Sequence, residues 1–152
     1  RRRLLVNGVP LWLLGIEDRG HTGFSSPGDL GDFGAFQHYW QDAESVLADL
    51  LAEIPSSDSR LLLVHNPDFV EMLPSGPIDL ALSGHTHGGQ VRVPFLGAPF
   101  VPSCFGQTFV SGLVEGTHTQ VYVSRGVGSI PPAVRLNCRP EVTVLTLSGK
   151  TT

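Results

Sequence analysis

The sequence has little of what defines several large protein classes. Only two of its 152 residues are cysteines, Cys104 and Cys138, and their spacing matches neither a disulfide framework nor a zinc motif. We expect free thiols, although an oxidising compartment would allow the two to pair. No apolar run approaches the roughly 20 residues needed to span a bilayer. Charged residues make up 16%, and the net charge of -4 gives no general attraction to nucleic acid or anionic membranes.

The hydrophobic content of 41% is ordinary for a globular protein, so we expect a real core. The length and the lack of internal repeats predict a single domain over residues 1–152. Three arginines open the chain, but a turn at Asn7-Gly8 follows instead of the apolar core of a signal peptide. Because the chain opens in mid-strand without a methionine, we expect it to be part of a longer protein.

Hydrophobic periodicity predicts strands at both ends and mixed structure between them. The predicted strands cover 1–6, 9–16, 61–64, 78–83, 91–93, 108–114, 120–124 and 141–147. A two-residue turn joins the first two of these strands. Spacing of i, i+3, i+4 and i+7 predicts a helix over 43–54, with Asp42 at its start and Pro55 at its end. Residues 19–36 read as a loop. The fold class predicted is α/β, or α+β by strict count.

The most informative stretch is Ser83-Gly84-His85-Thr86-His87-Gly88-Gly89-Gln90. On extended backbone, His85 and His87 would point to the same side. A third histidine, His65, ends an apolar strand just as His85 does. Residues 66–73 between these strands read as a crossover helix, which would make the strands parallel and bring His65 beside His85 at one sheet edge.

Three converging imidazoles suit zinc, manganese, iron, nickel or copper, so we predict that His65, His85 and His87 are metal ligands. Alone they would make a mononuclear site with an open position for water, whereas phosphoester hydrolases commonly use two ions and a bridging carboxylate. Gly20-His21-Thr22-Gly23 looks like a partial copy of the central stretch, but a lone loop histidine is usually solvated. We assign no role to His21, His38 or His118.

Several blocks of this sequence together resemble a known family. They are Gly15-Ile16-Glu17-Asp18, Val64-His65-Asn66-Pro67-Asp68, Gly84-His85-Thr86-His87-Gly88-Gly89-Gln90, Tyr122-Val123-Ser124-Arg125-Gly126-Val127-Gly128 and Arg139-Pro140-Glu141-Val142. In this order they resemble the C-terminal half of the calcineurin-like metallophosphoesterase superfamily, and more narrowly its bacterial membrane-associated phosphodiesterases. The resemblance covers nearly the whole chain.

The resemblance implies a four-layer αββα sandwich with mixed sheets and a binuclear metal centre. It implies two divalent ions such as Mn, Zn or Fe, with His65 and His85 on one and His87 on the other. Family members also carry Asp-x-His, Gly-Asp-x-x-Asp and Gly-Asn-His-Asp motifs upstream. The first and third do not occur here, and Gly28-Asp29-Leu30-Gly31-Asp32 resembles the second only superficially, because it falls in the predicted loop after the hairpin. The chain would therefore be the C-terminal portion of a metallophosphoesterase domain, inactive without the N-terminal half.

Three functional hypotheses follow. The first is a metal-dependent phosphodiesterase or phosphatase, to which this chain contributes histidine ligands and which acts on a small-molecule or lipid phosphoester. The second is a non-catalytic metal-binding or interaction domain that keeps half of the fold. The third is a mononuclear three-histidine hydrolase. Family members are often membrane-anchored or exported through an N-terminal segment, which this sequence does not contain, so the sequence leaves the compartment open. Substrate and metal identity are also left open.

Overall fold

The computed structural model describes residues 1–17 and 33–148. The elements in chain order are β1 (Arg2–Val6), β2 (Val9–Ile16), α1 (Phe33–Leu51), β3 (Ser59–Val64), η2 (Pro67–Met72), β4 (Leu80–Ser83), η3 (His87–Gly89), β5 (Gly112–Glu115) and β6 (Gln120–Val123). The two η elements are short 3-10 helices. His21 lies outside the described residues. No helix in the described ranges is long and apolar enough to cross a membrane.

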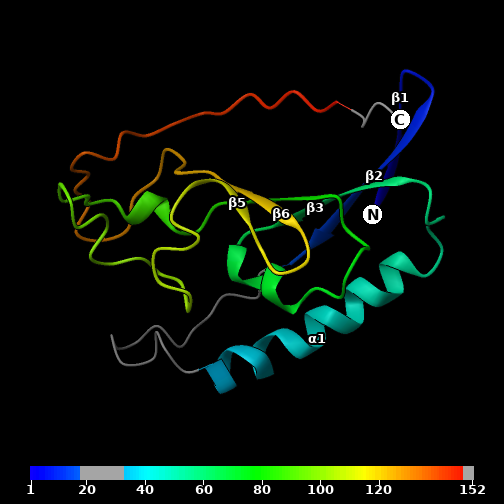
Figure 1. Ribbon diagram of the computed structural model, residues 1–152, viewed down its shortest axis with the longest axis horizontal. Coiled ribbons are helices and arrows are strands. Elements are labelled where there is room, and N and C mark those ends of the chain that lie inside the picture. The colour runs from blue at the N-terminus through cyan, green and yellow to red at the C-terminus, as the bar shows by residue number, and fades with distance from the viewer. Residues whose placement is uncertain (18–32, 149–152) are drawn as a thin grey trace.

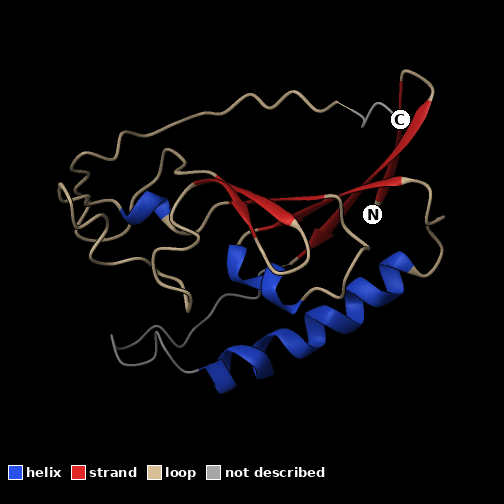
Figure 2. Ribbon diagram, in the orientation of Figure 1, coloured by secondary structure: helices blue, strands red, loops and turns tan. Residues whose placement is uncertain are grey.

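The strands form one mixed six-stranded sheet in the order β1-β2-β3-β4-β6-β5. The four central strands are parallel, and the edge strands β1 and β5 each pair antiparallel with a neighbour. Figure 2 shows this sheet with the long helix α1 along one side. The predicted α/β class with a mixed sheet is confirmed. The described residues form one sheet, and the second sheet of the sandwich that the family resemblance implies stays a prediction.

The first two strands form the predicted hairpin. Asn7 and Gly8 connect them, with φ angles of 52° and 82°. Two successive positive φ values match a tight hairpin turn that follows the twist of the strands, and Asn-Gly is the dipeptide that adopts them at least cost. The local sequence therefore fixes the pairing of β1 with β2.

One face of the sheet is the core. A row of residues in register across the central strands, Leu14, Leu62, Ala81 and Val121, is fully buried. Residues of α1 and η2 cover this row, and Trp40 of α1 packs on Phe69 of η2 with ring centroids 4.7 Å apart. Burial of each large side chain contributes roughly 1.5–3 kcal/mol. This packing anchors the sheet that positions the histidines.

The opposite face is much less covered. The next row in register contains Leu63, Leu82, Tyr122 and Leu113. Leu63 is 42% exposed and Leu113 is 60% exposed. In Figure 1, α1 lies on one side of the sheet and the C-terminal segment runs as an extended trace on the other. The chain thus presents apolar side chains on both faces of the sheet but buries only one face fully.

Several predicted boundaries are wrong. Helix α1 begins at Phe33, so Asp42 lies inside it and residues 33–36 are helical rather than loop. It ends at Leu51, before Pro55. The apolar spacing of its second half continues back through Trp40, Phe36 and Phe33, so the pattern was present and the prediction began the helix too late.

Two predicted strands are also absent from the described sheet. Residues 91–93 form only isolated bridges, and residues 141–147 run extended without a neighbouring strand. Val142 and Val144 there are 87% and 91% exposed. Alternating apolar residues make a strand only where a partner supplies the hydrogen bonds.

Candidate metal centre at the carboxyl ends of β3 and β4

Two of the three predicted histidines lie side by side. His65 follows β3 and His85 follows β4, and these strands are parallel neighbours. The backbone N–H of Gly84 donates to the carbonyl of His65 over 3.0 Å, which continues the pairing beyond the strand ends. The two imidazole rings meet edge to face, with centroids 5.2 Å apart. The predicted neighbourhood of His65 and His85 is confirmed.

The crossover between these strands is built as its sequence indicates. Asn66 precedes η2, and its side chain accepts a hydrogen bond from the backbone N–H of Asp68 over 3.0 Å. Pro67 follows at the first helical position, where a missing N–H costs nothing. This cap turns the chain directly after His65 and leaves that side chain exposed at the sheet edge.

The backbone around His85 and His87 is not extended, contrary to the prediction. Both residues have positive φ, 65° and 51°, and His87 begins the short helix η3. The alternation of side chains along a strand therefore does not apply to this pair. The strand ends at Ser83, and the glycine-rich stretch after it forms a tight turn instead.

The turn is packed too closely for larger residues. A Cβ added to Gly88 would lie 2.6 Å from Cγ of Arg125 and 2.7 Å from Sγ of Cys138. A Cβ on Gly89 would lie 2.4 Å from the Cβ of Ala98. Both glycines also have positive φ, which side chains rarely tolerate. Glycine is required here for close approach as well as for backbone conformation.

His87 lies against the loop that follows β6. Its Nδ1 atom is 3.3 Å from the carbonyl oxygen of Gly128. Gln90 ties the same two segments together, because its side chain accepts from the N–H of Ile130 and donates to that residue's carbonyl. The structure therefore brings His65 and His85 together and holds His87 next to residues 128–130.

The neighbouring histidines could bind a metal ion, but they are fewer than the protein ligands of a complete metal site. Two neighbouring imidazoles are suitable ligands for zinc, manganese or iron. Across residues 1–17 and 33–148, no group of three or more His, Cys, Asp or Glu side chains is placed to hold one ion. A catalytic zinc site ordinarily uses three protein ligands. The described residues thus fit part of a metal centre.

Asp68 is the buried carboxylate nearest to this region in sequence, and it serves packing. It is 1% exposed and accepts hydrogen bonds from Ser103 Oγ (2.6 Å) and from the N–H of Cys104 (2.7 Å). Burial raises its pKa, and these hydrogen bonds oppose the shift without cancelling it. Sequence reasoning placed Asp68 at a helix start, and no local pattern indicated that it anchors residues 103–104.

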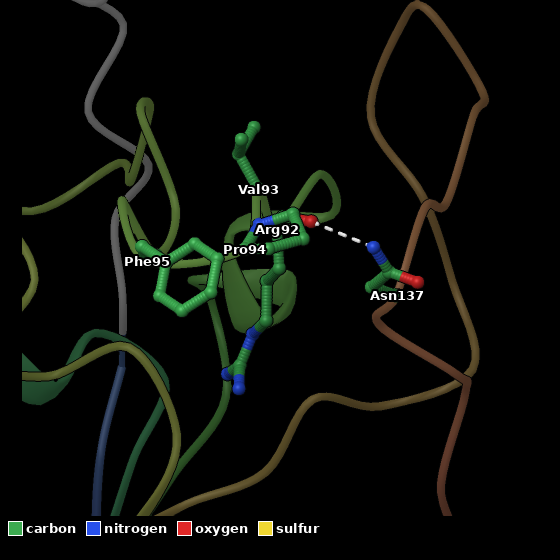
Figure 3. A pocket seen from close by; sticks show the side chains of 6 residues that line it. Arg92, Val93, Pro94, Phe95 and Asn137 are labelled. Carbon is green, nitrogen blue, oxygen red and sulfur yellow. Dashed lines mark hydrogen bonds between the residues drawn. The ribbon is translucent and has the colours of Figure 1, made fainter.

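A surface hollow lies beside the turn. Figure 3 shows its lining side chains, with Asn137 donating to the carbonyl of Arg92 over 3.0 Å. The lining residues are Arg92, Val93, Pro94, Phe95, Gly97 and Asn137. None of them is a histidine or a carboxylate, so the hollow is separate from the candidate metal centre.

Comparison with known proteins finds relatives that are named as a phosphodiesterase and as metallophosphoesterases. The chain is 50% identical over 96 residues to phosphodiesterase YaeI of Escherichia coli, a match that covers 61% of the chain and 35% of YaeI. It is 41% identical over 89 residues to the uncharacterized metallophosphoesterase YkuE of Bacillus subtilis, covering 59% and 31%. The uncharacterized metallophosphoesterase Cj0846 of Campylobacter jejuni is 36% identical over 131 residues, covering 84% and 33%.

The chain is related to the calcineurin-like metallophosphoesterases. It spans about a third of the length of these curated relatives. No family model matches the sequence, and no solved structure matches it. These relatives confirm the family resemblance that the sequence blocks indicated.

Proposed function

We propose that this chain supplies histidine ligands to a metal-dependent phosphoester hydrolase with a binuclear centre. The supporting observation is the contact of His65 and His85 at the carboxyl ends of two parallel strands, where open α/β sheets place their sites. The relatives named as metallophosphoesterases give the reaction class. The name phosphodiesterase YaeI points to phosphodiester substrates.

In this proposal His65 and His85 hold one divalent ion and His87 holds the other. His65 is exposed, and His85 and His87 are half-buried, so the site is open to a substrate from solvent. When bound, such ions make a coordinated water more acidic and stabilise negative charge on phosphoryl oxygens. The task of this chain is to orient three imidazoles at the sheet edge.

The remaining ligands, including a bridging carboxylate, come from sequence outside the described residues. Three observations support this. The described residues bring only two imidazoles together, and the chain spans about a third of its relatives. The weakly covered row that contains Leu63 and Leu113 supplies an apolar face on which further structure would pack. The 152-residue chain alone would then bind metal weakly and lack activity.

The test compares the 152-residue chain with the full open reading frame that encodes it. Metal content and bis(p-nitrophenyl) phosphate hydrolysis are measured on both. The proposal expects two ions and turnover in the longer protein only. In that protein, His85→Ala and His87→Ala should each lower turnover by about 100-fold or more, because each removes a ligand. His118→Ala is the matched control, since His118 is an exposed histidine between β5 and β6.

Unchanged turnover in both histidine variants would contradict the ligand assignment. Turnover by the 152-residue chain with one bound ion would replace the binuclear proposal with a mononuclear one.

A further inference from the structure

The guanidinium of Arg135 binds mainly to backbone carbonyls around His87, with one further contact to Sγ of Cys138 over 3.6 Å. It donates to the carbonyl of His87 over 3.1 Å and to the carbonyl of Gly128 over 2.6 Å. It also donates to the carbonyls of Arg125 (2.8 Å) and Cys138 (3.3 Å). Within the described part of the chain, no carboxylate forms an ion pair with Arg135. This half-buried cation thus joins three separate segments through their carbonyl oxygens.

One of these carbonyls is also the partner of the His87 ring. Gly128 O lies 3.3 Å from Nδ1 of His87. A carbonyl oxygen only accepts hydrogen bonds, so this contact requires the ring proton on Nδ1. A neutral imidazole has one ring proton, and Nε2 is then the nitrogen with the free lone pair. The contact therefore selects the nitrogen that His87 can offer to a metal ion.

Neither segment lies in the sheet or in a helix longer than one turn. His87 lies in a single 3-10 turn with positive φ, and Gly128 is exposed in a loop after β6. Arg135 contacts both, so it fixes the distance between the His87 backbone and the acceptor of the His87 ring. A planar guanidinium with five N–H groups can do this, whereas a single ammonium cannot reproduce the fork.

We propose that Arg135 is a positioning residue for His87. By holding Gly128 O in place, it keeps His87 as the Nδ1–H tautomer, with Nε2 directed to a ligand. The inference rests on the proposed function for its metal-binding consequence, but the tautomer is a property of the metal-free chain. Metal-binding histidines ordinarily donate their second N–H to a carboxylate or a backbone carbonyl in this way.

The first experiment reads the tautomer directly. Two-bond ¹⁵N–¹H correlation spectra of the metal-free chain are recorded at about pH 8.5, where an imidazole is neutral. His87 is assigned from its absence in His87→Gln. We expect the Nδ1–H tautomer to dominate in the wild type and to lose that dominance in Arg135→Ala. Arg139→Ala removes the same charge from an exposed residue nearby and should leave the tautomer unchanged.

Arg135→Lys retains the positive charge and covers the case in which the alanine variant does not fold. It should also lose Nδ1–H dominance, because it cannot donate to His87 O and Gly128 O in the same geometry. An Nε2–H tautomer in the wild type would overturn the proposal. So would an unchanged Nδ1–H population in a folded Arg135 variant.

The second experiment measures Zn²⁺ and Mn²⁺ affinity by titration calorimetry on the full open reading frame. Loss of the partner that orients a ligand typically costs about 10- to 100-fold in affinity, and we expect this range for Arg135→Lys and no change for Arg139→Ala. If the tautomer responds as expected but His87→Ala leaves metal binding unchanged, Arg135 positions His87 and the proposed ligand role of His87 fails. If metal binding requires His87 but not Arg135, the positioning role fails.

Discussion

The carboxylate of Glu141 accepts hydrogen bonds from both the backbone and the guanidinium of Arg125. The backbone N–H donates over 3.0 Å and Nε over 2.6 Å, and the two side chains form an ion pair. This pair fastens the start of the C-terminal segment to the end of β6. The segment 125–128, whose last residue Gly128 contacts His87, is therefore held from both directions along the chain.

The Glu141 pair predicts a pH-dependent contribution to stability. Burial alone would raise the pKa of Glu141, but the hydrogen bonds and charge of Arg125 outweigh burial and lower it below the usual value of 4.5. The unfolded chain thus binds the proton more tightly, so the contribution is present above about pH 4.5 and is lost as pH falls through the lower, folded-state pKa. Denaturant unfolding of wild type and Glu141→Gln should differ by about 1 kcal/mol at pH 7, converging in acid.

The control for Glu141→Gln is Asp49→Asn, a neutralised exposed carboxylate on α1. It should leave the unfolding free energy nearly unchanged at both pH values. A Glu141 difference that persists undiminished at pH 3 would show that the charge is not its cause.

Removing the Asp68 carboxylate should lower the free energy of unfolding more than removing the Ser103 hydroxyl. Asp68→Ala leaves two donors, Ser103 Oγ and the N–H of Cys104, without their acceptor in a buried place, and should cost about 2–3 kcal/mol. Ser103→Ala removes one donor and keeps the carboxylate bound to Cys104, so about 1 kcal/mol is expected. Thermal unfolding monitored by circular dichroism ranks the variants. An equal loss in both would mean that Ser103 carries the whole interaction.

Because the pKa of Asp68 is raised, its contribution to stability changes with pH in the opposite direction from that of Glu141. The folded chain holds the Asp68 proton more tightly than the unfolded chain, whose value is near 3.8. Its contribution is therefore largest below about pH 3.8 and decreases as pH rises through the higher, folded-state pKa. In Asp68→Asn this decrease should disappear from the stability profile between pH 3.5 and the neutral range. A profile identical to wild type would exclude Asp68 as the titrating group.

The glycines of the central stretch should tolerate no side chain. Gly89→Ala combines positive φ with a contact of 2.4 Å to Ala98, and a cost of about 2–3 kcal/mol is expected. Gly15→Ala is the control, since nothing lies within 4 Å of its added Cβ and its φ is not positive. Urea unfolding of both variants tests this. Equal stability of the two would show that the turn relaxes freely.

A substitution on the weakly covered sheet face should change stability differently in the 152-residue chain and in the longer protein proposed above. Leu113→Thr should barely change the stability of the 152-residue chain, because Leu113 is already 60% exposed. In the full open reading frame it should cost about 1–2 kcal/mol if further structure buries that face. Leu62→Ala, which opens the buried face, should cost about 2–5 kcal/mol in both. A neutral Leu113→Thr in the longer protein would contradict packing on this face.

The sequence predicted the elements that local patterns control. Asn7-Gly8 specifies the hairpin, Asn66-Pro67 specifies the start of η2, and matched apolar strands place His65 beside His85. Each of these depends on neighbouring residues or on one parallel crossover. The family resemblance also depends on contiguous sequence blocks, and the relatives that the chain matches support it.

What the sequence did not reveal depends on distant contacts. The sequence predicts extended backbone at His85 and His87, but a turn forms there in which Gly88 packs against Arg125 and Cys138, far along the chain. Arg135 lies in an irregular segment, and nothing in its neighbourhood shows that its donors reach His87 and Gly128. Long-range hydrogen bonds of this kind leave no periodicity for a sequence argument to read.

The contact of His65 with His85 and the turn at His87 require different lengths of chain to be synthesised before they can form. The His65–His85 contact needs only β3, η2 and β4, which are adjacent in sequence. The turn at His87 also needs Arg135, 48 residues downstream. Because a growing chain emerges from the ribosome N-terminus first, the imidazole pair can assemble while the turn is still open. The contact of His65 and His85 would therefore form before the position of His87 is fixed.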